Sequence, residues 1–208
     1  PIAEELYRIA KDLDPARMVI DSDGLTTKNW LNGERDRATL DYFAFQFDVF
    51  NLPQDRPGLY EFPGGPPKPV ISHETGNFGT FPMLDQVEMF EHNIKPFWLV
   101  AAREKVAAKG LLGEVETWVR NSQRLYYLCH KLNIEEIRKN PCISGHHWWL
   151  FQDYWTGSNG LVEAYFRPKQ YIEPSKVRRF VNDVVLLEDG LEWTYCAGDA
   201  VNISFLVS

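Results

Sequence analysis

The sequence has little cysteine, no long apolar run and no excess of positive charge. Only 3 of its 208 residues are cysteine, too few and too scattered for a disulfide framework or a zinc ribbon, and their number leaves the redox compartment open. No apolar run is long enough to cross a bilayer, so no transmembrane helix is expected. Lysine and arginine number 22 against 29 acidic residues; the net charge of −7 argues against a nucleic-acid or membrane-surface partner.

Aromatic side chains, by contrast, are abundant. They make up 14% of the residues and include 7 tryptophans. Aromatic rings beside polar groups suit stacking on sugars or bases, whereas most buried rings simply fill a core. A chain of this length can bury the core of one or two domains, so both uses are open.

Short apolar runs alternate with helical patterns along most of the chain. Apolar residues at helical spacing predict a first helix over residues 2–13, which Asp14-Pro15 ends. The other expected elements are strands within 18–24, 40–51, 69–79 and 143–155, helices over 84–108, 113–139 and 175–184, and strand-like runs from residue 185 onward, broken at 189–190 and 198–199. Strands separated by loops and helices are typical of βαβ units. The sequence therefore predicts an α/β protein with a parallel sheet.

Each of the four expected strands starts apolar and ends in polar side chains. These end groups are Asp21 and Asp23, then Gln46 and Asp48, then His73 and Glu74, then Gln152 and Asp153. In a parallel barrel the C-terminal ends of all strands meet on one face, which carries the active site. Such residues also cap turns and helices, and one polar ending would mean little. Four strands that end in this way favour a functional site at the C-terminal edge of the predicted sheet.

Two of these strand segments resemble known motifs. PVISHETGNF, from Pro69 to Phe78, resembles the seventh-strand motif of glycoside hydrolase family 2, the family of β-galactosidase- and β-glucuronidase-like enzymes. GHHWWLFQD resembles the eighth-strand motif, with Gly145, Trp149 and Asp153 at the characteristic places. The resemblance implies that residues 1–183 are the C-terminal half of a TIM (β/α)8 barrel, strands five to eight. It implies that residues 184–208 begin a β-sandwich domain.

The resemblance also implies a partner for this chain, and we expect no cofactor. The general acid/base of the family is a glutamate in an Asn-Glu pair that ends strand four, and this dipeptide does not occur here. Four strands cannot close a barrel, which needs eight strands and roughly 250 residues. We therefore expect the rest of the same polypeptide, an N-terminal half-barrel, to complete the site, and a carbohydrate to be the substrate.

The resemblance assigns roles to individual residues. Glu74 is expected to be the nucleophile, and Trp149 the wall of the sugar subsite. The other expected sugar-binding residues are His73, Asn77, Gln152, Asp153, Asp48 and Trp155. Three of them have a plainer alternative: Glu74 as a strand-end carboxylate paired with an arginine, Trp149 as a core residue, and Asp153 as a loop cap. Adjacent strand residues point to opposite sides, so Trp148 and Trp149 cannot both face inward, and Trp149 is the expected inward one.

Other kinds of site have weaker support. A metal site would need His73 or Glu74 together with His146 or His147, and the HExxH pattern is absent, so no metal is expected. No GxSxG elbow indicates a serine hydrolase. The main hypothesis is a retaining exo-β-glycosidase. The alternatives are a non-catalytic carbohydrate-binding or scaffold protein with a degenerate barrel, and a different hydrolase that uses Glu74 as a base.

Overall fold

The chain folds into two compact units of mixed helix and strand. The computed structural model describes residues 2–20, 40–45, 68–90, 95–154, 157–192 and 194–208. The first unit comprises Pro1–Thr75, Leu132–His147 and Arg178–Ser208, and the second comprises Gly76–Lys131 and Trp148–Val177. Mixed helix and strand with parallel strand pairing is compatible with the predicted α/β class. The expected domain boundary at residue 184 stays a prediction.

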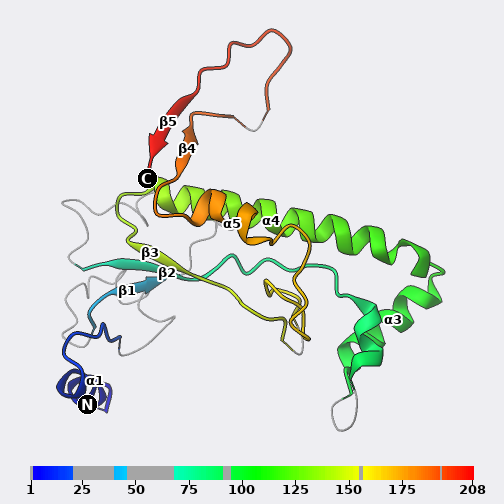
Figure 1. Ribbon diagram of the computed structural model, residues 1–208, viewed down its shortest axis with the longest axis horizontal. Helices are drawn as coiled ribbons and strands as arrows, with labels where there is room; N and C mark the ends of the chain where they lie inside the picture. Colours follow the sequence, from blue (N-terminus) through cyan, green and yellow to red (C-terminus); the bar gives the residue numbers. More distant parts are fainter. Residues whose placement is uncertain (1, 21–39, 46–67, 91–94, 155–156, 193) are drawn as a thin grey trace. The chain divides into compact units, whose positions relative to one another are not determined.

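The first unit is built on a three-stranded sheet. Its strands are β1 (Phe43–Phe45), β2 (Val70–Thr75) and β3 (Gly145–Trp148), in the order β1-β2-β3 (Figure 1). β1 and β2 run parallel, with Phe43 opposite Val70, and both of these side chains are buried. Beside β2, the Ser144 N–H donates to the Val70 carbonyl at 2.7 Å. β2 is therefore the central strand, and its C-terminal end carries His73 and Glu74.

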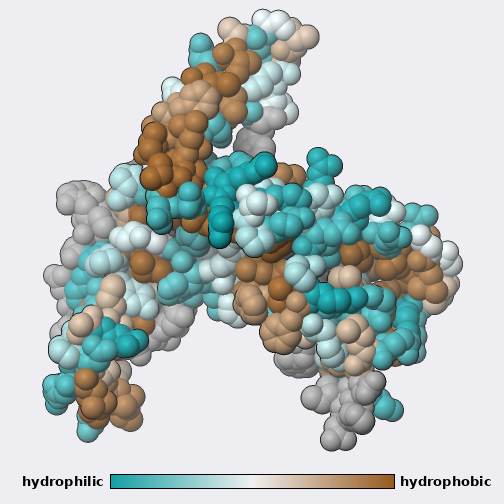
Figure 2. Space-filling model, in the orientation of Figure 1, coloured by the Kyte–Doolittle hydropathy of each residue, from teal (hydrophilic) through white to brown (hydrophobic). Residues whose placement is uncertain are grey.

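A hairpin of two antiparallel strands follows at the C-terminal side of the same unit. β4 (Leu186–Asp189) pairs with β5 (Ser204–Val207), and Gly190, with φ 87°, follows β4 directly. The predicted break at residues 189–190 is confirmed, because only glycine adopts this φ at little cost. Leu187 is buried, while apolar side chains elsewhere along the hairpin are exposed and show as brown atoms in Figure 2.

Three of the predicted helices form close to their expected bounds. They are α1 (Ile2–Leu13), α4 (Val115–Lys139) and α5 (Pro174–Val181). α4 contributes residues to both units, with Leu132 the first that belongs to the first unit. Within the first unit Ile134, Ile137 and Phe180 are almost fully buried, so the apolar faces of α4 and α5 supply much of its core.

The helical stretch predicted over 84–108 is interrupted. The structure has a short 3₁₀ helix, η1 (Leu84–Met89), and then α3 (Phe97–Ala108), followed by η2 (Leu112–Glu114). Pro96 is the N-cap residue of α3. A helix cannot pass through this position because proline has no N–H and restricts the residue before it to extended conformations. Leu84, Val87, Leu99 and Val106 form the apolar core of the second unit.

No helix within the described residues combines the length and the apolar character that a bilayer crossing requires.

Asp41 joins α1 to the segment before β1. Its Oδ1 accepts a hydrogen bond from the Tyr7 hydroxyl at 2.6 Å, and its Oδ2 accepts from Lys11 Nζ and the Val19 N–H, both at 2.9 Å. Partial burial opposes the charge of Asp41. The three donors outweigh burial and lower its pKa from 3.8 to about 2.

This pKa makes the stability of the first unit sensitive to acid. A carboxylate whose folded pKa is depressed stabilises the fold above its unfolded pKa, and that stabilisation is lost as the pH falls from 3.8 to about 2. We expect Asp41→Asn to lower the denaturation midpoint at pH 7 and to flatten its decline in this acid range. Asp12→Asn, an exposed carboxylate on the same helix, is the control. Parallel pH profiles for the wild type and Asp41→Asn would contradict the assignment.

Candidate functional site

Glu74 lies near the C-terminal end of β2 in an unusual backbone conformation. Its φ is 47°, in the left-handed region, and its side chain is partly exposed. Two other described non-glycine residues share a positive φ, Phe166 and Tyr171, but both lie outside the named strands and helices. A left-handed residue costs about 1–3 kcal/mol and persists only where its surroundings enforce it. Such residues cluster at active sites, and Glu74 is the one of these three that lies in a sheet strand, next to its last residue.

The residue after Glu74 is fixed by buried hydroxyl groups. Thr75 Oγ1 donates to the carbonyl of Ser72 at 2.9 Å and lies 2.7 Å from the Ser72 hydroxyl. Both residues are fully buried. These hydrogen bonds link the last residue of β2 back to Ser72, three residues earlier. They are among the constraints that hold the Glu74 backbone in its left-handed conformation.

In the second unit, Gly76 packs directly against the ring of His130. The Gly76 φ is 78°, and a Cβ at this position would overlap the His130 ring. His130 on α4 is fully buried and is stacked on Trp148 at a centroid distance of 4.1 Å, with Tyr126 at 4.3 Å and Phe78 at 5.1 Å. Because these three aromatic side chains hold the His130 ring in place, only glycine fits at position 76.

The close contact predicts the effect of a methyl group at Gly76. Gly76→Ala is expected to lower the free energy of unfolding by about 2–4 kcal/mol, since it adds overpacking to a left-handed backbone. Gly79→Ala is the matched control, because a Cβ on Gly79 has no heavy atom within 4 Å. Urea denaturation of the two variants measures the difference. Equal urea midpoints for the two variants would contradict this prediction, because they would show that the His130 ring moves aside for the added methyl group.

Trp149 lies where the chain leaves β3. The peptide bond between Trp149 and Leu150 is cis, and the Trp149 ring makes an edge contact with Tyr154 at 6.5 Å. Its Nε1 is buried and has no hydrogen-bond partner in the part of the chain that the structure describes. An indole N–H normally finds an acceptor when it is buried. This donor can therefore serve a bound ligand.

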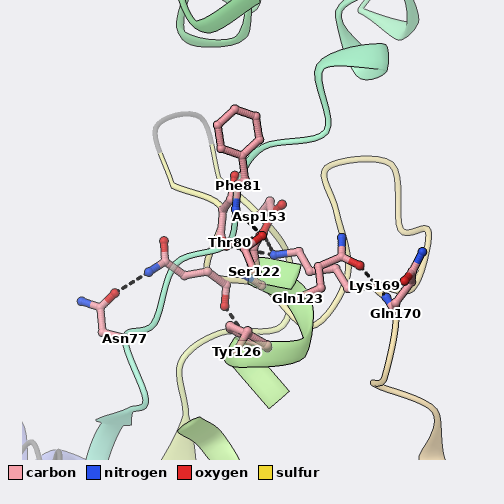
Figure 3. A network of polar contacts seen from close by, with 12 residues as sticks. Asn77, Thr80, Phe81, Ser122, Gln123, Tyr126, Asp153, Lys169 and Gln170 are labelled. Atoms are coloured by element: carbon pink, nitrogen blue, oxygen red, sulfur yellow. Dashed lines mark hydrogen bonds and ion pairs between the residues drawn. The ribbon is translucent and has the colours of Figure 1, made fainter. Parts of the chain in front are cut away.

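Asp153 belongs to a buried ion pair in the second unit (Figure 3). Its Oδ1 lies 2.7 Å from Lys169 Nζ and accepts the Gly160 N–H at 2.7 Å. Lys169 Nζ also donates to the Ser158 carbonyl at 2.9 Å and lies 5.3 Å from the centre of the Tyr126 ring. The two side chains are only 11% and 1% exposed. Burial raises the pKa of Asp153 and lowers that of Lys169, although each partner favours the charge of the other.

The two predicted sugar-binding amides in this unit bind neighbouring loops. Asn77 Oδ1 accepts a hydrogen bond from Asn159 Nδ2 at 2.6 Å, and Gln152 Nε2 donates to the Ala164 carbonyl at 2.6 Å. Trp149, Gln152 and Asp153 thus lie in the irregular segments 149–154 and 157–164, and Asn77 is bonded to the second of them. The printed contacts of Asn77, Gln152 and Asp153 link these segments to one another and to Lys169.

His73 and Glu74 belong to the first unit, and two predicted residues cannot be placed. His73 is buried in β2. Asp48 and Trp155 lie outside the described residues, as do the weaker candidates Asp21, Asp23 and Gln46.

In the part of the chain that the structure describes, neither clustered metal ligands nor a disulfide bond marks a further site. Within the described ranges, no three His, Cys, Asp or Glu side chains are grouped to hold a metal ion. In the first unit, burial and the nearby Arg138 lower the pKa of His146. None of the three cysteines is in a disulfide bond.

Sequence reasoning missed the charged residues that organise the second unit. The fully buried Glu163 carboxylate accepts two hydrogen bonds from Arg167, Nε to Oε1 at 2.7 Å and Nη2 to Oε2 at 3.0 Å. This carboxylate raises the pKa of Arg167. Neither pair left a clear signal in the sequence. The i,i+4 spacing of Glu163 and Arg167 indicates contact only on a helix, and this segment is not helical, whereas Asp153 and Lys169 lie 16 residues apart.

No protein-family model matches the chain, and no curated protein sequence matches it significantly.

Proposed function

We propose that this chain carries the nucleophile half of a retaining exo-β-glycosidase of the family 2 type, with Glu74 as the nucleophile. In such an enzyme one ionised carboxylate attacks the anomeric carbon and a second carboxyl group, about 5–5.5 Å away, protonates the leaving oxygen. Glu74 would form the covalent glycosyl ester, and water would then hydrolyse it. The resemblance assigns the second carboxyl group to a segment outside these 208 residues.

The backbone of Glu74 is the observation that carries the proposal. A carboxylate near the C-terminal end of a central strand, in a left-handed conformation, lies where parallel-sheet enzymes hold their reacting groups. The parallel pairing of β1 and β2 is compatible with strands six and seven of a (β/α)8 barrel, which is the finer fold that we propose. For Trp149 we propose the sugar-stacking role, with its buried Nε1 available to a ligand oxygen.

A second candidate is a non-catalytic carbohydrate-binding protein. The unpartnered Nε1 of Trp149 favours it to the same degree, because binding alone would use that donor. Asn77, Gln152 and Asp153 are engaged in contacts that order their own loops, so they distinguish neither candidate.

A covalent label separates the two candidates. The protein is incubated with a panel of 2-deoxy-2-fluoro-β-glycosides, and its intact mass is measured under denaturing conditions before peptide mapping. A fluorosugar ester on Glu74 supports the glycosidase. Exposed Glu116 on α4 is the internal control for non-specific esterification. Saturable sugar binding without any adduct would favour the binding protein.

A further inference from the structure

The second unit contains a cavity lined by few polar groups. Its volume is about 200 Å³, and its walls include Phe90, Trp98, Leu99 and Tyr154. Phe90 and Trp98 meet edge to face at 5.7 Å. Trp149 does not line it, and neither does Glu74. The cavity is therefore distinct from the groups assigned to catalysis above.

Gln86 is the unusual member of the lining. It lies on η1 between the core residues Leu84 and Val87 and is only 3% exposed. Its carboxamide makes no hydrogen bond to any residue of the described ranges, and its nitrogen and oxygen are not sealed in the core, so they reach the open space of the cavity. The carboxamide is therefore free to bind a molecule in the cavity.

Asp153 offers a second polar group to the same cavity. Its Oδ1 is occupied by Lys169 and the Gly160 N–H, whereas Oδ2 has no hydrogen bond within the segments that the structure describes. Lys169 neutralises the carboxylate, so the site selects a neutral ligand that donates hydrogen bonds rather than a cation. The amide of Gln86 adds one acceptor and two donors.

The volume limits the ligand to one ring. Sites for drug-sized molecules occupy about 300–1,000 Å³, and an engineered cavity of about 150 Å³ holds one benzene molecule. About 200 Å³ therefore accommodates a single six-membered ring with its substituents. The aromatic walls suit the apolar C–H face of such a ring, and the two polar groups suit its hydroxyls.

We infer that this cavity binds a single neutral monosaccharide ring, with hydroxyl groups on Gln86 and Asp153 and the C–H face against Trp98. The inference does not depend on the proposed function, because it requires binding and no turnover. It adds a sugar site that involves neither the expected nucleophile Glu74 nor the expected sugar-stacking Trp149, and it gives Asp153 a place in that site.

The test is a titration of the protein with methyl β-D-glucoside, methyl β-D-galactoside and methyl β-D-mannoside, followed by ¹⁵N NMR. We expect at least one of them to shift the Gln86 side-chain amide and the Trp98 indole resonances with one saturable curve. Gln86→Leu keeps the volume, removes the carboxamide and identifies its resonances. It is expected to weaken binding about tenfold while the melting temperature stays level or rises. Gln170→Leu, an exposed glutamine of the same unit, should leave the affinity unchanged.

Two outcomes would overturn the inference. One is the absence of saturable shifts with every sugar, which would mean that the cavity holds only water. The other is saturation by adenosine or benzamide at these resonances with no response to the sugars, which would assign the site to a planar aromatic ligand. Repeating the titration in Glu74→Gln separates the two proposals, because binding in the cavity is expected to survive that change whether or not Glu74 is a nucleophile.

Discussion

Glu74→Gln is expected to reduce glycosidase turnover by about 10⁴-fold or more, a loss of the size seen when a covalent nucleophile is removed. Glutamine keeps the shape of the side chain but cannot form the glycosyl ester. The hydrogen bonds of Thr75 and the contact of Gly76 with His130 do not involve the Glu74 carboxylate oxygens. The loss should therefore appear in kcat with little change in the melting temperature.

Two further measurements make this result specific. Glu116→Gln, an exposed glutamate on α4, should retain full activity. Added azide should rescue Glu74→Ala and yield a glycosyl azide of inverted configuration, since a small anion can occupy the space of the missing carboxylate. Full activity of Glu74→Gln would end the nucleophile assignment.

Lys169→Met is expected to lower the free energy of unfolding by about 3–5 kcal/mol, because it leaves the buried charge of Asp153 without its partner. The Asp153 side chain is 11% exposed, so water replaces little of the lost contact. The change also removes the hydrogen bond to the Ser158 carbonyl and the cation over the Tyr126 ring. Urea denaturation monitored by tryptophan fluorescence measures the loss.

The chain supplies a close control for this prediction. Lys176 also pairs with a carboxylate, Glu173 at 2.9 Å, and lies 4.8 Å from the centre of the Tyr171 ring, but both partners are well exposed. Lys176→Met should therefore cost about 1 kcal/mol or less.

A double substitution tests the cause of the Lys169 effect. Burial disfavours both charges of the pair, as the directions of the two pKa shifts indicate. Lys169→Met combined with Asp153→Asn should recover most of the lost stability, because no unpaired charge is left. Equal losses for Lys169→Met and Lys176→Met, or no recovery in the double variant, would contradict the argument.

Local patterns predicted most of the secondary structure. The apolar spacing of residues 2–13 and the Asp14-Pro15 stop gave α1 its bounds, and Asp189-Gly190 ended β4 as expected. The prediction was wrong around Pro96, where apolar residues on both sides resembled one helix although proline cannot continue it. The strand expected over 143–155 was too long, since β3 ends at Trp148 and an irregular segment follows.

The sequence by itself determined the α/β class, the strand that carries Glu74 and the residues to substitute in a test. Only the tertiary structure decided that Glu74 adopts a left-handed conformation, that Gly76 is required by the His130 ring, and that Asp153 pairs with Lys169. The reason is physical. Helix and strand patterns arise from side chains a few residues apart, whereas burial, ion pairing and cavities depend on segments that meet only after the chain has folded.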